Sequence, residues 1–231
     1  MKPLDYFFDT PASGEGRSPQ RFRTFFAGLV RVILGPLFRY RAYDLHEQLA
    51  KLPADQGIII AGNHCSNLDP VFVLSVLRPR VVRFMSKEEL FALNPVIARL
   101  ASWIGVFPVK RDSADLLAVK RAVRMLKRGE YVGIFPEGTR VRFAGQTVVN
   151  HEGIALIARL AKAPVLPVRL WGTERICPEG KRLFRLPRIT LRFGEPLALD
   201  DPMFVGMEKE ELLAAFTTEV MRRVYALEPP R

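Results

Sequence analysis

From residue 57 onward, the sequence alternates short apolar runs with segments of helical periodicity. The apolar runs predict strands at residues 57–62, 81–85, 131–135, 165–170 and 189–193. The segments between them predict helices at residues 71–77, 87–93, 114–128 and 153–162. Strands that are apolar on both faces and alternate with helices are typical of a parallel sheet. We therefore expect an α/β fold, a single domain with a mostly parallel mixed sheet flanked by helices on both faces.

A few residues with special backbone roles refine this pattern. Ser113 is the expected N-cap of the helix at 114–128, and Gly129 is its expected C′ residue. Phe107 and Val109 alternate as in a strand that points apolar side chains inward. Pro167 lies within a strand-like run, where a proline favours an edge or a bulge and leaves space beside a ligand.

The first 41 residues differ from the rest of the chain. Residues 10–20 are rich in Pro, Gly and Ser, which predicts a flexible leader. Residues 21–38 place apolar side chains at three- and four-residue steps, as in an amphipathic helix: Phe22, Phe25, Phe26, Leu29, Ile33 and Leu37. Arg31 interrupts this segment, so no apolar run reaches the roughly 18–20 residues of a membrane-spanning helix.

The helix at 21–38 has two possible roles. Its aromatic residues and flanking arginines suit the interface of a membrane, while its apolar face also suits packing on the domain. The sequence permits both. We expect residues 1–41 to form a leader and a membrane-associating helical segment, and residues 42–231 to form the α/β domain. The N-terminus lacks the basic and apolar regions of a signal peptide.

The chain of 231 residues carries a formal net charge of +11, which favours polyanionic partners. Residues 181–192 are a basic stretch without an acidic residue. The partner could be nucleic acid, an anionic membrane or an acidic protein. No helix-turn-helix, zinc-finger or RNA-binding motif supports nucleic acid, which remains the alternative from a different functional class.

Two cysteines and three histidines, scattered along the chain, provide neither a disulfide framework nor metal-ligand spacing. We expect a reducing, cytoplasmic setting and no metal.

A polar cluster follows the predicted strand at 57–62, where open α/β sheets bind their ligands. His64 is the side chain here whose ordinary pKa suits a general base near neutral pH. Asp69 could accept a hydrogen bond from its imidazole and stabilise the imidazolium. The other interpretation is structural: Asp69 and Pro70 also fit the N-cap and first position of the next helix.

A second polar cluster, Phe-Pro-Glu-Gly-Thr-Arg at residues 135–140, follows another predicted strand. Arg140 is suited to a bidentate contact with a phosphate, and Thr139 could add a donor. A surface turn with a local Glu–Arg pair is the alternative. In the segment 105–111, Lys110 and Arg111 end the strand that contains Phe107. They are either ligands of an anion or solvated charges.

Together, the order and spacing of these blocks resemble the glycerolipid acyltransferases, the family of bacterial 1-acyl-glycerol-3-phosphate acyltransferases. The matching blocks are N-H-x-x-x-x-D at Asn63, His64 and Asp69; G-x-F-x-x-x-R at Gly105, Phe107 and Arg111; F-P-E-G-T-R at residues 135–140; and a proline block around Pro167. The resemblance covers about residues 57–197.

The resemblance implies His64 and Asp69 as the catalytic dyad. It assigns the glycerol-phosphate acceptor to Arg111, Glu137, Gly138, Thr139 and Arg140, with Lys87 near the phosphate. His151 is a departure, because many relatives have a lysine at that position. It either replaces that cation in part or has no role.

The implied reaction is direct acyl transfer to lysophosphatidic acid, which forms phosphatidic acid in phospholipid biosynthesis. The donor would be an acyl-CoA or acyl carrier protein thioester, with no other cofactor, at the cytoplasmic face of the membrane as a peripheral or monotopic protein. Another lysolipid acceptor is an alternative. A hydrolase with Cys65 as nucleophile is disfavoured, because neighbouring side chains rarely face each other and no G-x-S-x-G elbow is present.

Overall fold

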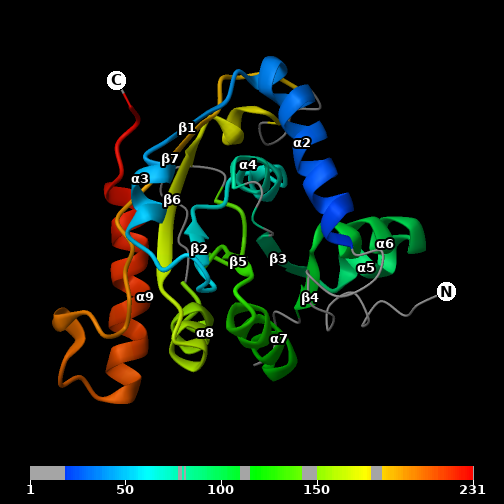
Figure 1. The fold of residues 1–231 in the computed structure, drawn as a ribbon. Coiled ribbons are helices and arrows are strands. Elements are labelled where there is room, and N and C mark those ends of the chain that lie inside the picture. Colours follow the sequence, from blue (N-terminus) through cyan, green and yellow to red (C-terminus); the bar gives the residue numbers. More distant parts are fainter. Residues whose placement is uncertain are drawn as a thin grey trace.

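The computed structural model describes residues 19–77, 80, 82–109, 115–141, 150–177 and 184–230. Within these ranges, seven strands form one sheet in the order β1-β7-β6-β2-β5-β3-β4 (Figure 1). The strands are β1 (Arg41–Tyr43), β2 (Ile59–Gly62), β3 (Val82–Lys87), β4 (Phe107–Val109), β5 (Tyr131–Ile134), β6 (Val165–Trp171) and β7 (Thr190–Phe193). Strands β6 and β7 pair antiparallel, and the other neighbours pair parallel. The predicted mostly parallel mixed sheet is confirmed.

Helices cover both faces of this sheet (Figure 1). They are α2 (Pro19–Phe38), α3 (Leu45–Ala50), α4 (Asp69–Val76), α5 (Glu89–Leu93), α6 (Pro95–Ile104), α7 (Leu116–Lys127), α8 (Gly153–Ala161) and α9 (Lys209–Ala226). Ile59 and Ala61 of β2 pack in a core with α7, α8 and α9. Ile58 and Ile60, which point to the opposite face, pack in a second core with α2 and α4. Two layers of helices therefore bury the sheet and leave its strand ends for ligands.

Several local expectations need correction. Asp115, not Ser113, caps α7, because its side chain accepts hydrogen bonds from the N–H groups of Leu117 and Ala118. Ser113 itself lies outside the described residues. Gly129 follows α7 with φ 77°, as its predicted C′ role requires. The sequence patterns did not predict β1, α3, α6 or α9, of which β1 and α3 have only three and six residues.

Pro167 lies in an interior strand, so the predicted edge position is wrong. β6 pairs with β2 on one side and with β7 on the other. The bulge alternative describes the position better. The backbone of Val165 exchanges hydrogen bonds with Leu197, the carbonyl of Pro167 accepts from Gly194, and the ladder with β7 begins only at Val168. Pro167 therefore faces an irregular turn where its missing N–H costs no ladder bond.

Helix α2 packs on the domain with one side, while its membrane-associating role stays a prediction. Ala27, Val30 and Phe38 are buried against the domain, and α2 contacts α4 and α6. The opposite side of α2 exposes a row of large apolar residues: Phe25, Leu29, Val32, Ile33 and Leu37. Within the described ranges, no helix is both long enough and apolar enough to cross a membrane.

Candidate active site

The candidate side chains gather where neighbouring strands end. Strands β6, β2, β5, β3 and β4 are parallel neighbours, so their C-terminal ends lie at one edge of the sheet. His64 follows β2, residues 135–140 follow β5, and Lys87 is the last residue of β3. Arg111 lies outside the described residues, although β4, which leads to it, ends beside Lys87. This is the edge where open α/β sheets bind ligands.

The structure joins His64 and Asp69 directly. The Nδ1 atom of His64 lies 2.9 Å from Oδ2 of Asp69. The same oxygen accepts hydrogen bonds of 2.7 Å from the backbone N–H groups of Cys65 and Ser66. Asp69 is fully buried. Three donors on one carboxylate oxygen fix the position of the acid and shape the loop around the histidine.

The predicted N-cap role of Asp69 is wrong. Asp69 is the first residue of α4, and Leu68 occupies the N-cap position without a side-chain hydrogen bond to the helix. The carboxylate instead turns back to the preceding loop, where it contacts Cys65 and Ser66 as well as His64. A negative charge in the first turn still suits the helix dipole.

The contact with Asp69 determines which nitrogen of His64 can act. When Nδ1–H donates to the carboxylate, Nε2 carries the lone pair. The side chain of His64 is 13% exposed, so a substrate can reach a ring that is otherwise enclosed. A buried acid behind a partly accessible imidazole is the arrangement that general-base catalysis needs.

Two phenylalanines support the imidazole. The ring of Phe135 stacks on His64 with centroids 4.4 Å apart and planes 16° apart. Phe84 stacks on the other side of Phe135 at 5.8 Å. Phe84 needs Gly133 beneath it, because a Cβ on Gly133 would lie 2.1 Å from the Phe84 ring. Strand β5, which ends directly before Phe135, thus fixes the plane of the His64 ring.

Asn63 anchors the start of the loop at residues 63–69, which is the predicted catalytic loop. Its side-chain amide donates to the carbonyl of Leu170 at 3.0 Å, and its side-chain oxygen accepts from the N–H of Leu170 at 2.8 Å. The buried amide therefore continues the hydrogen bonding between β2 and β6 for one more residue. The family motif includes this asparagine, and the structure shows what it does.

Residues 135–141 hold the backbone of His64 from both sides. The N–H of His64 donates to Oε2 of Glu137 at 2.7 Å, and the carbonyl of His64 accepts from the N–H of Val141 at 2.7 Å. The other Glu137 oxygen accepts a hydrogen bond from the hydroxyl of Tyr225. Burial raises the pKa of Glu137, although the contacts with Tyr225 and His64 oppose that shift. Both carboxylate oxygens are thus engaged by the protein, while contact between Glu137 and an acceptor stays a prediction.

The rest of this turn is open to solvent to differing degrees. Thr139 is exposed and Arg140 is half-buried. Gly138 has φ 61°, and a Cβ there would lie 2.5 Å from the ring of His151. His151 also donates its backbone N–H to the carbonyl of Pro136. The structure therefore brings His151 onto the turn, whereas the sequence had placed it there only by resemblance.

Most backbone donors of the catalytic loop are already used. The N–H groups of His64, Cys65 and Ser66 donate to carboxylates, and those of Leu68 and Asp69 donate to Ser66. An oxyanion would have to displace one of these acceptors to bind there. These five N–H groups are therefore poor candidates for stabilising the oxyanion of an acyl transfer.

Cys65 is poorly suited to act as a nucleophile. Burial, together with the negative charge of Asp69, raises the pKa of its thiol to about 12. The reactive thiolate is scarce at neutral pH under these conditions. Among the described residues, no group of three or more His, Cys, Asp and Glu side chains is placed to hold a metal ion.

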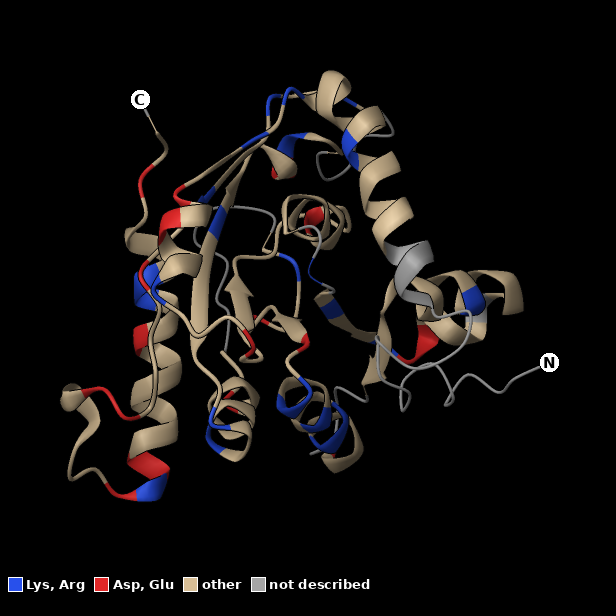
Figure 2. Cartoon of the chain, in the orientation of Figure 1, with Lys and Arg blue, Asp and Glu red and all other residues tan. Residues whose placement is uncertain are grey.

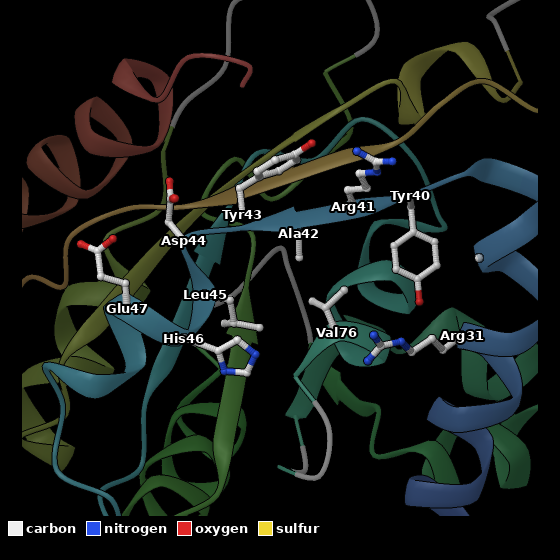
Figure 3. A pocket seen from close by; sticks show the side chains of 11 residues that line it. Arg31, Tyr40, Arg41, Ala42, Tyr43, Asp44, Leu45, His46, Glu47 and Val76 are labelled. Atoms are coloured by element: carbon white, nitrogen blue, oxygen red, sulfur yellow. The ribbon is translucent and has the colours of Figure 1, made fainter. Parts of the chain in front are cut away.

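A cavity of about 590 Å³ lies away from the dyad (Figure 3). It is bounded by α2, β1, α3 and Val76, with Arg31 and Tyr40 on one side and Glu47 on the other. Val76 is seven residues after Asp69 along α4, which corresponds to roughly 10 Å. This cavity therefore belongs to the edge of the domain and not to the catalytic loop.

Comparisons with known proteins agree with this geometry. A family model described as Acyltransferase matches residues 45–171. A protein of Bacillus subtilis named 1-acyl-sn-glycerol-3-phosphate acyltransferase is 34% identical over 88% of this chain and 96% of its own length. A protein of the same name from Streptococcus pneumoniae is 28% identical over 84% of this chain and 69% of its own length.

A solved structure shares the fold. The crystal structure of a 1-acyl-sn-glycerophosphate acyltransferase from Thermotoga maritima matches with a TM-score of 0.66 and 24% identity. The match covers 94% of this chain and 86% of the other.

Proposed function

Because the chain belongs to the acyltransferase family, we propose that it moves a fatty-acyl group from an acyl thioester to the free hydroxyl of 1-acyl-glycerol-3-phosphate. The product would be phosphatidic acid, an intermediate of phospholipid biosynthesis. The single observation that carries the proposal is the contact between His64 and the buried Asp69, which leaves Nε2 as a base. The similar proteins of Bacillus subtilis and Streptococcus pneumoniae are named for acylation of 1-acyl-sn-glycerol-3-phosphate, which supports this acceptor.

The proposed reaction proceeds without a covalent enzyme intermediate. His64 Nε2 takes the proton of the acceptor hydroxyl while that oxygen attacks the thioester carbonyl. The carbonyl carbon forms the new ester bond, the bond to sulfur breaks, and the thiolate accepts the proton from His64. Asp69 stabilises the positive imidazolium between these two transfers. Phe135 and the backbone contacts of His64 keep the ring in one orientation throughout.

The phosphate of the acceptor would bind beside this base. The proposed acceptor-binding residues are Lys87 at the end of β3, Arg111 after β4, and Glu137, Gly138, Thr139 and Arg140 after β5. Gly138 gives the turn its positive φ and leaves room for His151. Because a carboxylate repels a phosphate, Glu137 would contribute by holding the turn against the backbone of His64.

The donor would be acyl-CoA or acyl carrier protein, and no further cofactor is required by the chemistry. Both donors carry negative charge, which suits a chain with a net charge of +11.

We also propose that the protein lies on the cytoplasmic face of the membrane through α2 and α6. Arg31 is the one charged residue from 24 to 38, and Figure 2 shows the described part of α2 with little charge. The exposed side of α2 is apolar, and α6 beside it exposes Val96, Ile97 and Leu100. Large exposed apolar surfaces of this kind favour a lipid interface.

The function is tested with purified protein, lysophosphatidic acid and each donor in turn, with the acyl product identified by mass spectrometry. We expect phosphatidic acid, and His64→Ala should lower the rate by about 10²–10⁴-fold without unfolding the protein. A wild-type rate in His64→Ala would disprove the mechanism. Product from another lysolipid but not from lysophosphatidic acid would disprove the proposed acceptor.

Membrane association is tested by flotation with liposomes that contain anionic lipid. Deleting α2 would expose the core around Phe38, so substitution is the better test. Val32→Glu on the exposed side should reduce binding, while Val205→Glu, at an equally exposed apolar residue far along the chain, should not. If Val32→Glu bound liposomes as well as the wild type does, this face of α2 would be excluded as the membrane-contacting surface.

A further inference from the structure

The last turn of α9 is fixed to the sheet by two arginines. Arg169 of β6 donates to the backbone carbonyls of Tyr225 and Leu227. Arg192 of β7 donates to the carbonyl of Glu228 at 3.2 Å. The last carbonyls of a helix have no partner within it, so these contacts satisfy groups that would otherwise need water. The end of α9 is thereby held at a defined position on the sheet.

Aromatic contacts reinforce this attachment. The guanidinium of Arg169 lies 5.3 Å from the ring centre of Tyr225 and 5.1 Å from that of Trp171. A cation between two aromatic rings is a favourable arrangement that limits the rotation of both rings. Tyr225 is thus held through its backbone by hydrogen bonds and through its ring by Arg169.

The hydroxyl of this tyrosine reaches the catalytic loops. It donates to Oε1 of Glu137, which is 3% exposed, while Oε2 of Glu137 accepts from the N–H of His64 at 2.7 Å. Two hydrogen bonds, joined by the side chain of Glu137, therefore connect α9 to the backbone of His64. Tyr225 and Glu137 are 88 residues apart in sequence.

We propose that Tyr225 is a positioning residue for the acyl transfer: its hydroxyl holds the Glu137 carboxylate, which in turn fixes the backbone of His64. The inference rests on the proposed function for its kinetic consequences. Tyr225 does not contact the reacting atoms in this scheme. It sets the direction of the Glu137 carboxylate, because a carboxyl with one oxygen bound can rotate about its last bond, whereas one with both oxygens bound cannot.

The charges around Glu137 make the contact sensitive to pH. Tyr225 approaches from α9, His64 and Asp69 from the catalytic loop and α4, and Arg169 of β6 lies behind Tyr225. The hydrogen bond from Tyr225 lowers the pKa of Glu137 against the rise that burial causes. Removing the hydroxyl therefore raises that pKa further, so that Glu137 becomes protonated at a higher pH than in the wild type.

The test is Tyr225→Phe, which removes one oxygen and keeps the ring beside Arg169. We expect kcat to fall about 10- to 100-fold, the range for a lost hydrogen bond to a charged group, with an unchanged acceptor KM. In the pH profile of kcat, the loss of activity on the acid side should occur at a higher pH than in the wild type. Tyr131→Phe is the matched control, since Tyr131 is a buried tyrosine at the opposite end of β5. It should leave kcat and its pH profile unchanged.

A combined substitution distinguishes a positioning role of Tyr225 from a general loss of rigidity in the site. In a Glu137→Ala protein, Tyr225→Phe should cause no further loss of kcat, because the link is already broken. A wild-type kcat in Tyr225→Phe, a change confined to the acceptor KM, or an equal loss in both backgrounds would overturn the proposal.

An NMR measurement keeps this test independent of the reaction. The chain has three histidines, so selective ¹⁵N labelling gives three backbone amide signals, and His64→Ala identifies one of them. We expect Tyr225→Phe to shift the His64 amide signal and to leave those of His46 and His151 in place. An unchanged His64 signal would overturn the link even if the protein transferred no acyl group, whereas a shifted signal without acyl transfer would overturn only the proposed function.

Discussion

The two turns that follow β2 and β5 contribute to the site in opposite ways. In residues 64–69, the contacts that hold the Asp69 carboxylate are local: His64, Cys65 and Ser66 all donate to Asp69, at most five residues away. In residues 135–141, the contacts are distant: Glu137 reaches His64 across 73 residues and Tyr225 across 88. The first turn builds the base, and the second turn holds it in place while presenting Thr139 and Arg140 near the same edge.

This difference predicts whether a substitution affects the chemical step or the binding of the acceptor. A change in the first turn should affect the chemical step, because the side chains there form the base and its partner. A change in the exposed part of the second turn should affect acceptor binding, and a change in its buried part should affect the position of His64. The following substitutions test this division.

Asp69→Asn should have the largest effect. An asparagine oxygen can still accept from Cys65 and Ser66, so the loop keeps its anchor, but the charge that stabilises the imidazolium is lost. We expect kcat to fall about 10²–10⁴-fold with a nearly unchanged acceptor KM. The measurement is steady-state kinetics with lysophosphatidic acid as the varied substrate.

Asp69→Asn should also cost some stability. The three hydrogen bonds to Oδ2 would then end on a neutral oxygen. Hydrogen bonds to charged groups contribute about 1 kcal/mol more than neutral ones, so Tm should fall by several degrees. Asp200→Asn, at an exposed aspartate, serves as the control for both readouts. A wild-type kcat in Asp69→Asn would show that Asp69 only shapes the loop.

Arg140→Ala should have an intermediate effect of a different kind. If its guanidinium binds the acceptor phosphate, the acceptor KM should rise about 10- to 100-fold, as expected for a charge-assisted hydrogen bond. The donor KM should stay the same, and Arg140→Lys should recover part of the loss. Arg159→Ala, at an exposed arginine of α8, is the control. A rise confined to the donor KM would place the thioester, and not the phosphate, beside Arg140.

The contrast between the turns also explains what the sequence could reveal. His64 and Asp69 are five residues apart and follow a predicted strand, so their contact could be anticipated from spacing and chemistry. Most of the sheet was predictable from local sequence too, because β2, β5 and β6 are short, largely apolar runs, whereas the three-residue strand β1 was not predicted. The resemblance to the acyltransferases then indicated that residues 135–140 belong to the same site as His64 and Asp69.

Contacts between distant segments could not be anticipated. Nothing in the sequence pairs Tyr225 with Glu137, since α9 has a mixed pattern and its position depends on packing against the whole sheet. The stack of Phe84, Phe135 and His64 depends on the register of β3 and β5, which places Gly133 beside Phe84. The sequence could not decide between the dyad and the helix cap for Asp69, because its residue type and the following proline satisfy the cap pattern, while the direction of its carboxylate depends on the fold.

Gly138→Ala should have a small effect, and it tests the packing of the second turn against His151. The substitution places a Cβ 2.5 Å from the His151 ring at a residue with φ 61°. The left-handed conformation costs a non-glycine residue about 1–2 kcal/mol, so Tm should fall by a few degrees. His151→Ala should restore part of this loss, because it removes the steric clash but leaves the backbone strain. Full restoration by His151→Ala would show that crowding, and not φ, requires the glycine.

His151→Ala alone addresses whether this histidine replaces the lysine of many relatives. His151 is exposed, so a charge there should change the acceptor KM by at most about fivefold, the range for an exposed ion pair. If His151 supplied a full phosphate contact, its loss would raise the acceptor KM as much as Arg140→Ala does. A small effect would instead leave His151 as a residue that packs on Gly138, and the phosphate contacts would then belong to the exposed part of the turn.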